Sequence, residues 1–261
     1  EASNYYKQAA DQGHVESMFK YAYLHDKGDG IEKNKKEAAQ YYELAAKQDH
    51  VNSMLHYAIL LDEGDGIEEN KKKASHYFKL AADLGNSQAM FKYALMLDGG
   101  DGIEVNKVEA AKYYKSAADK EHVKAMFNYA LMLDNGEGIE TNKREAAHYY
   151  KLAADKGHTK SMYNYALMLD NGEEIEENKS EASHYYKLAA EQGHDKALYK
   201  YAKMLDNGYG VIQNKYEAVQ CYKFSADQGN PKAMFKYASK VANGDGIEIN
   251  KSEAAKYYRS A

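Results

Sequence analysis

Hydrophobic and polar positions follow a helical period in short blocks along the chain. The first block of a typical unit, residues 123–134, has its apolar side chains at Met126, Tyr129, Ala130 and Leu133. Steps of three, four and seven residues place these side chains on one face of an α-helix. A second block covers residues 143–156, and its apolar positions are Ala146, Tyr149, Tyr150, Ala153 and Ala154. The pattern therefore predicts two amphipathic helices joined by a short connection.

The residues at the ends of these two blocks are typical of helix ends. Gly136 and Gly138 follow the first block, and glycine accepts the positive φ values with which many helices stop. Asn142 is a good N-cap for the second helix, and Glu145 three residues later completes a capping box. Gly157 then ends the second helix. Each unit is therefore expected to be a helix–loop–helix.

This unit of 36 residues recurs along the whole chain without an insertion. One tyrosine, for example, occupies seven equivalent positions: Tyr21, Tyr57, Tyr93, Tyr129, Tyr165, Tyr201 and Tyr237. The Asn-x-x-Glu pair occurs in six of seven units, and Lys73 interrupts it once. A helix pair of this size cannot bury both of its apolar faces alone, whereas stacked pairs can. We therefore predict an all-α fold, with a single α-solenoid over residues 1–261.

The predicted solenoid has a second helix from a truncated repeat, six full repeats and a truncated last repeat. Their boundaries are 1–13, 14–49, 50–85, 86–121, 122–157, 158–193, 194–229 and 230–261. The tyrosine pairs at 5–6 and 257–258 keep the internal pattern, so neither end has a polar capping repeat. We therefore expect a piece of a longer protein, with end-to-end self-association through the uncapped faces.

The segments 125–139 and 142–158, with their small residues, Gly-x-Gly and Ala-Ala-x-x-Gly landmarks, resemble the Sel1-like repeat. That family belongs to the tetratricopeptide-type α-solenoids. Tyr129 stands where the family usually has Leu, and Ala130 stands where it usually has Gly. The resemblance implies a right-handed superhelix that acts as a non-enzymatic scaffold or adaptor, often in signalling. Such a protein binds other proteins or peptides on its concave surface.

Composition excludes several other classes of protein. A formal net charge of −5 and a pI near 6.1 argue against a nucleic-acid binder, which needs a basic surface. No apolar run is long enough to span a membrane. The single cysteine, Cys221, leaves no internal disulfide and no cysteine-based zinc site, and it favours a cytoplasmic location. Cys221 replaces a recurring tyrosine, and we expect an inert, buried thiol.

No catalytic, cofactor or metal site emerges from the motifs. The Gly-x-Gly segment follows a helix rather than a strand, so it does not predict a nucleotide site. Asp62, Glu63 and Asp65 cluster but lack the spacing of a calcium loop. An aspartate recurs at the C-terminal end of the first helix, where the helix dipole disfavours it. We expect its carboxylate to accept hydrogen bonds from the loop N–H groups.

Candidate binding residues lie on the first helices, opposite the apolar stripe, on the side that lines the concave face in related solenoids. These residues are Lys124, Asn128, Leu131, Asn135, Lys160, Asn164, Leu167, Asn171, Lys196, Lys200, Lys203, Lys232 and Lys236. The first position of this set changes from Glu16 in the first full unit to lysine in the later units. Lysines often serve only to keep a helical surface soluble. Their gradient nevertheless predicts that an acidic or phosphorylated peptide binds at the C-terminal half.

Two further interpretations stay open at this stage. The chain is alternatively a regulatory or targeting segment of a larger multidomain enzyme, for example a kinase, whose catalytic domain lies outside residues 1–261. RNA-reading solenoids also use helix pairs of this length, although the acidic pI argues against RNA.

Overall fold

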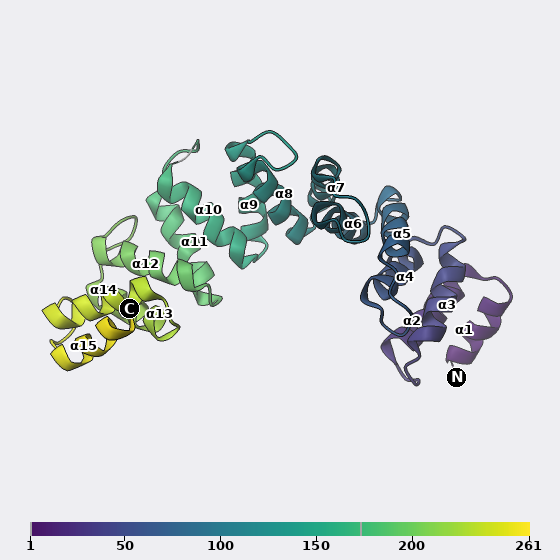
Figure 1. The fold of residues 1–261 in the computed structure, drawn as a ribbon, viewed down its shortest axis with the longest axis horizontal. Coiled ribbons are helices and arrows are strands. Elements are labelled where there is room, and N and C mark those ends of the chain that lie inside the picture. Colours follow the sequence, from purple (N-terminus) through teal and green to yellow (C-terminus); the bar gives the residue numbers. More distant parts are fainter. Residues whose placement is uncertain (1, 173) are drawn as a thin grey trace. The chain divides into compact units, whose positions relative to one another are not determined.

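The computed structural model describes residues 2–172 and 174–261, and regular structure in these ranges is entirely α-helical (Figure 1). We call the two helices of each repeat its first and second helix. Within the described residues, the seven first helices are α2 Val15–Lys27, α4 Val51–Glu63, α6 Ser87–Gly99, α8 Val123–Asn135, α10 Thr159–Asn171, α12 Asp195–Asn207 and α14 Pro231–Asn243. Eight second helices are α1 Ala2–Asp11, α3 Lys35–Ala46, α5 Lys71–Asp83, α7 Lys107–Asp119, α9 Lys143–Asp155, α11 Lys179–Glu191, α13 Lys215–Asp227 and α15 Lys251–Ser260. The predicted alternation of first and second helices is confirmed.

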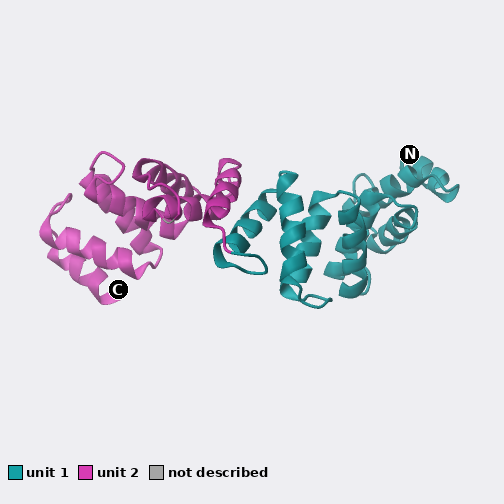
Figure 2. Ribbon diagram, turned by 90° about the horizontal axis from the view of Figure 1, so that it is seen from above, with its two compact units in different colours: residues 1–140 teal, residues 141–261 magenta. Residues whose placement is uncertain are grey.

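The helices form two compact units, residues 1–140 and residues 141–261 (Figure 2). Within each unit, a helix packs most closely against the helices that precede and follow it in the chain. This arrangement of stacked helix pairs is that of an α-solenoid, as the repeat predicts. The single domain over residues 1–261 stays a prediction.

Helix ends are formed by the predicted residues. His50 begins α4, and its Nδ1 accepts a hydrogen bond from the Ser53 amide at 3.2 Å. Asn34 begins α3, and its Oδ1 accepts from the Glu37 amide at 3.1 Å. Gly64 ends α4 with a φ of 64°, a left-handed conformation that L-residues with a Cβ rarely adopt. The sequence-based prediction of capping by asparagine and glycine is confirmed, and histidine acts as the N-cap of α4.

The core of each unit combines alanines with large aromatic rings. Ala22 and Ala38, on the facing helices α2 and α3, are completely buried and allow the two helices to approach closely. A large ring fills the remaining space at equivalent positions of the second helices, and these fully buried rings are Tyr42, Phe78, Tyr114, Tyr150, Tyr186 and Tyr222. Phe78 shows that the position selects an aromatic ring rather than a hydroxyl group.

In several repeats, a second tyrosine ties the repeat to the one before it. The Tyr41 hydroxyl donates to the Asp11 carboxylate, and the Tyr113 hydroxyl donates to Asp83, both at 2.6 Å. Each pair spans 30 residues and therefore joins second helices of successive repeats. These hydroxyl–carboxylate bonds are charge-assisted, which makes them stronger than bonds between neutral groups. They confirm the predicted role of the tyrosines in packing between repeats.

Among residues 2–172 and 174–261, no loop amide donates to the aspartates at the C-terminal ends of the first helices, so that prediction was wrong. The amides of Gly28 and Asp29 instead donate to the backbone carbonyl of Leu24. Asp26 is 4 % exposed, and its carboxylate is held by Lys35 Nζ at 2.5 Å and Lys27 Nζ at 3.0 Å. Two lysine charges thus offset both the burial of this carboxylate and its unfavourable position in the dipole of α2.

Lys35 also forms an ion pair with a residue of the next repeat. Lys35 lies 2.8 Å from Asp65, and Lys71 pairs with Asp62 at 2.7 Å and with Asp101 at 3.2 Å. The carboxylates of Asp62 and Asp65, whose spacing in the sequence does not match a calcium loop, are therefore each paired with a lysine. This cluster serves the contacts between repeats.

Candidate functional site

The predicted binding residues lie on the first helices of both units. Unit 1 holds Lys124, Asn128, Leu131 and Asn135 on α8, and unit 2 holds Lys160, Asn164, Leu167 and Asn171 on α10, Lys196, Lys200 and Lys203 on α12, and Lys232 and Lys236 on α14. The lysines at the first position of each set are exposed, whereas the second and third positions on α8 and α10 are half-buried. Because unit 2 holds nine of these residues, the candidate site is developed there.

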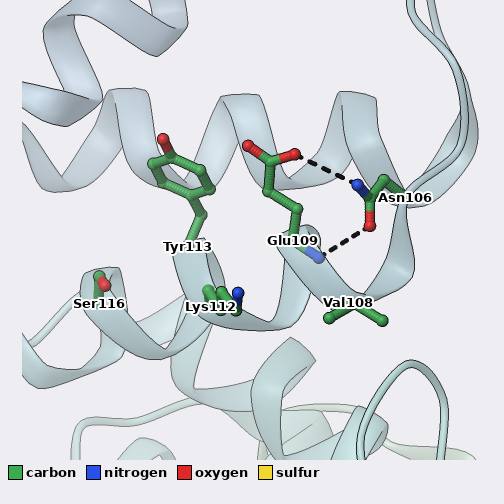
Figure 3. A pocket seen from close by; sticks show the side chains of 6 residues that line it. All are labelled: Asn106, Val108, Glu109, Lys112, Tyr113 and Ser116. Carbon is green, nitrogen blue, oxygen red and sulfur yellow. Dashed lines mark hydrogen bonds between the residues drawn. The ribbon is translucent and has the colours of Figure 1, made fainter.

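A depression on a second helix of unit 1 is lined by polar side chains that already bind other groups of the protein. It measures about 380 Å³ and lies along α7, where Asn106, Glu109 and Tyr113 line it (Figure 3). The Glu109 amide donates to Asn106 Oδ1 at 3.0 Å, and Asn106 Nδ2 donates to Glu109 Oε2 at 3.3 Å (Figure 3). The polar groups of this depression thus belong to the capping box of α7 and the Tyr113–Asp83 contact.

A larger hollow forms where α12 meets the turn before α14. Its volume is about 490 Å³, and its lining includes the rings of Tyr163 and Tyr199 and residues 228–231. Three lysines and one carboxylate complete the lining, and these are Lys196, Lys200, Lys232 and Asp195. An adjoining hollow shares Tyr199, Pro231 and Lys232 and continues to Phe235 and Lys236. Four of the five lysines at the C-terminal half of the predicted set therefore converge here. Lys203 is exposed but lines neither hollow.

Three aromatic rings form the floor between these lysines. Tyr163, Tyr199 and Phe235 come from α10, α12 and α14 and occupy the same position of successive repeats. Each ring packs against a tyrosine on the second helix of its own repeat, with centroids 5.5 to 5.9 Å apart. The sequence-based analysis missed these rings. Their recurrence at intervals of 36 residues was the signal that points to them.

The lysines around the rings differ in whether a carboxylate neutralises them. Lys200 Nζ lies 3.3 Å from the Asp170 carboxylate. Burial opposes ionisation of Asp170, but Lys179 and Lys200 outweigh it and hold its pKa below the usual range. Lys196, Lys232 and Lys236 have no ion-pair partner among the described residues. Their positive charges are therefore available at the surface that we call the α12–α14 face, made of Tyr199, Phe235 and these three lysines.

Other reactive or ligating groups offer no competing site. Cys221 is half-buried rather than fully buried as predicted. Desolvation nevertheless raises the pKa of its thiol to about 11, so the thiol is protonated at neutral pH. Within residues 2–172 and 174–261, no three His, Cys, Asp or Glu side chains gather as metal ligands do. Over the same ranges, none of the helices combines the length and the apolar character needed to cross a bilayer.

Comparison with known families accounts for this succession of helix pairs. The Sel1 repeat model matches eight consecutive segments, at 1–14, 15–50, 51–86, 87–122, 123–158, 159–194, 195–230 and 231–261. The chain belongs to the Sel1 repeat family. Sel1 repeats generally form protein-interaction scaffolds and are typically non-catalytic. The comparison with curated proteins finds no match.

Two solved structures are similar to this Sel1 repeat chain. A Sel1 repeat protein from Oxalobacter formigenes has 28% sequence identity and a TM-score of 0.72, with 92% of this chain and 95% of that one covered. A protective antigen of uropathogenic Escherichia coli that displays an SLR fold has 24% identity and a TM-score of 0.89. The match covers 99% of this chain but 55% of the antigen, so the chain spans about half of that protein's length. At this identity the antigen supports the fold alone.

Proposed function

We propose that the α12–α14 face of this Sel1 repeat protein binds an acidic segment of another protein. The observation that supports the proposal most directly is the position of Lys196, Lys232 and Lys236. These lysines lie beside the half-buried ring of Tyr199 and the exposed ring of Phe235, and they have no internal carboxylate partner among the described residues. An approaching carboxylate replaces no existing ion pair at these lysines. Charge complementarity of this kind raises association rates and selects partners.

In unit 1, the equivalent positions of α2, α4 and α6 lack such free charge. Lys20 pairs with Glu16 at 3.7 Å, and Lys92 lies 3.8 Å from Asp62. Asn52 and Gln88 are neutral. Lys124 on α8 is exposed and has no ion-pair partner among the described residues, so the free lysines begin at the last first helix of unit 1. The contrast between repeats that share one architecture supports a specific role for the lysines of unit 2 beyond solubility.

Charge reversal tests the proposal. Lys196→Glu, Lys232→Glu and Lys236→Glu are combined in the full chain, and binding to an acidic peptide pool is measured by calorimetry. We expect affinity to fall at least about tenfold, since each exposed ion pair is worth roughly 0.5–1 kcal/mol and reversal adds repulsion. Lys200 is left in place because it also holds Asp170.

The matched control reverses three exposed lysines of unit 1 that lie outside the face, Lys36, Lys72 and Lys120. It changes the net charge by the same amount, so a local site predicts that this variant binds as the parent does. Equal losses in both variants, or no loss in either, would refute the proposed site. Binding by the parent is also expected to weaken as salt increases.

A further inference from the structure

In several repeats, a histidine covers the aromatic ring of the repeat before it. The rings of Phe19 and His50 have centroids 4.9 Å apart, and those of Phe91 and His122 are 4.6 Å apart. In unit 2, His194 stacks on Tyr163, with centroids 4.5 Å apart and an interplanar angle of 22°. Each of these histidines is also the N-cap residue of the following first helix.

Tyr199 lacks such a cover because the next repeat begins with Asn230 instead of histidine. Asn230 still caps its helix, since its Oδ1 accepts from the amides of Lys232 and Ala233 at 3.1 and 3.3 Å. It has no ring to place on Tyr199, whose one ring contact among the described residues is with Tyr222. The hollow of about 490 Å³ lies beside Tyr199, against Gly229 and Pro231.

We propose that this hollow receives an aromatic side chain of the acidic segment, in the place that histidine fills in other repeats. The inference rests on the function proposed above and adds the residue that anchors the ligand. Tyr199 and Pro231 supply flat apolar surfaces, on which an aromatic ring packs better than an aliphatic chain. Lys196 and Lys232 border the same hollow, so carboxylates close to the ring in sequence meet positive charge.

Two acidic peptides that differ in one central residue, tryptophan or alanine, test the anchor. The chain contains no tryptophan, so indole emission comes from the peptide alone. We expect the tryptophan peptide to bind the full chain about tenfold more tightly or better, because burial of a large side chain adds apolar contact area. Its emission is expected to shift to shorter wavelength on binding, as the indole leaves water.

Asn230→His is the decisive variant, because the chain itself places histidine at five equivalent positions: His14, His50, His122, His158 and His194. The new ring is expected to cover Tyr199 and to reduce the preference for tryptophan over alanine to about twofold or less. Asn86→His is the matched control. Asn86 also caps a first helix. In the repeat before it, however, the position equivalent to Tyr199 is held by Leu55, which is buried and has no ring for a histidine to cover. This control is expected to keep the full preference.

The outcomes separate the anchor from the acidic site. If both peptides bind equally and the lysine reversals abolish their binding, the aromatic anchor is refuted and the acidic site stands. If Asn230→His keeps the tryptophan preference, the ring binds elsewhere and the inference fails. If neither peptide binds the parent chain, both the acidic site and its anchor are refuted.

Discussion

At the scale of single residues, Asp26 shows how an unfavourable position becomes a stabilising one. Its carboxylate is buried at the end of α2, where both desolvation and the helix dipole disfavour negative charge. Burial opposes ionisation, yet hydrogen bonds from Lys35 and Lys27 outweigh it, and the pKa of Asp26 lies below its usual range. The ionised carboxylate is therefore favoured in the folded state.

We expect Asp26→Asn to lower the free energy of unfolding by about 1–3 kcal/mol at neutral pH, the usual cost when a buried polar group loses its partner. Lys35 retains Asp65 in this variant, which limits the loss. Urea denaturation followed by circular dichroism measures the change. Asp29→Asn, at an exposed loop position, is the control and is expected to change stability by less than about 0.5 kcal/mol.

The effect of Asp26→Asn also has a defined pH dependence. Because the folded-state pKa is depressed, the unfolded chain takes up the proton first as the pH falls. The contribution of Asp26 is thus complete above about pH 5, where an unfolded aspartate is almost fully ionised, and it disappears as the pH drops through the lower folded-state pKa. A stability difference that grew on acidification would contradict this assignment.

At the scale of elements, the ion pair between the second helices α3 and α5 has its positive and negative residues exchanged relative to the equivalent pair in unit 2. Lys73 on α5 lies 2.9 Å from Glu43 on α3, whereas the equivalent pair in unit 2 is Lys223 on α13 and Glu253 on α15, 3.9 Å apart. Lys73 is the residue that interrupts the recurring capping box. It also donates to the Tyr57 hydroxyl at 2.7 Å. The exchange of both charges keeps an attractive pair at the α3–α5 junction.

Exchange of these two charges provides a direct test. Lys73→Glu alone places two carboxylates side by side, and we expect it to cost about 0.5–1 kcal/mol of unfolding free energy. Glu43→Lys alone places a second lysine beside Lys73 and is expected to lower the unfolding free energy by a similar amount. The double variant has the polarity of the α13–α15 junction and is expected to recover most of the loss. Chemical denaturation of all four chains measures the coupling, and simple addition of the two costs would disprove it.

At the scale of the whole molecule, stability depends on contacts between neighbours in the chain. Within each unit, the closest packing joins consecutive helices, as expected of a repeat protein. Tyr222 belongs to α13 and is fully buried, so its contacts lie with the helices immediately around it. A defect at this position is therefore expected to spread over nearby repeats rather than over the whole chain.

Tyr222→Ala tests this locality through hydrogen exchange of the full chain. Removal of a buried aromatic ring costs about 3–5 kcal/mol, and we expect amides of α12, α13 and α14 to lose most of their protection. Helices α2 to α5 are expected to exchange as they do in the parent. Tyr216→Ala, at a side chain that is 66 % exposed on the same helix, is the control. A uniform loss of protection along the chain would show global cooperativity instead.

The sequence by itself determined the helices, their ends and the repeat architecture. Helix periodicity, the Asn and His caps and the glycines act within a few residues of one another, so the chain reveals them directly. The α4 start at Val51 and its stop before Gly64 follow from such local signals. The gradient toward lysine in the later repeats was also visible without a structure.

Only the tertiary structure decided which side chains meet. Lys35 reaches Asp26 across nine residues and Asp65 across 30, and no local rule distinguishes these pairs from contacts with the loop amides. The same holds for Lys200, which Asp170 neutralises, and for Lys196, which has no such partner among the described residues. Tyr199 is uncovered because of a residue in the following repeat. Each of these outcomes depends on how stacked repeats bring distant side chains within contact distance, which the order of residues along one helix does not specify.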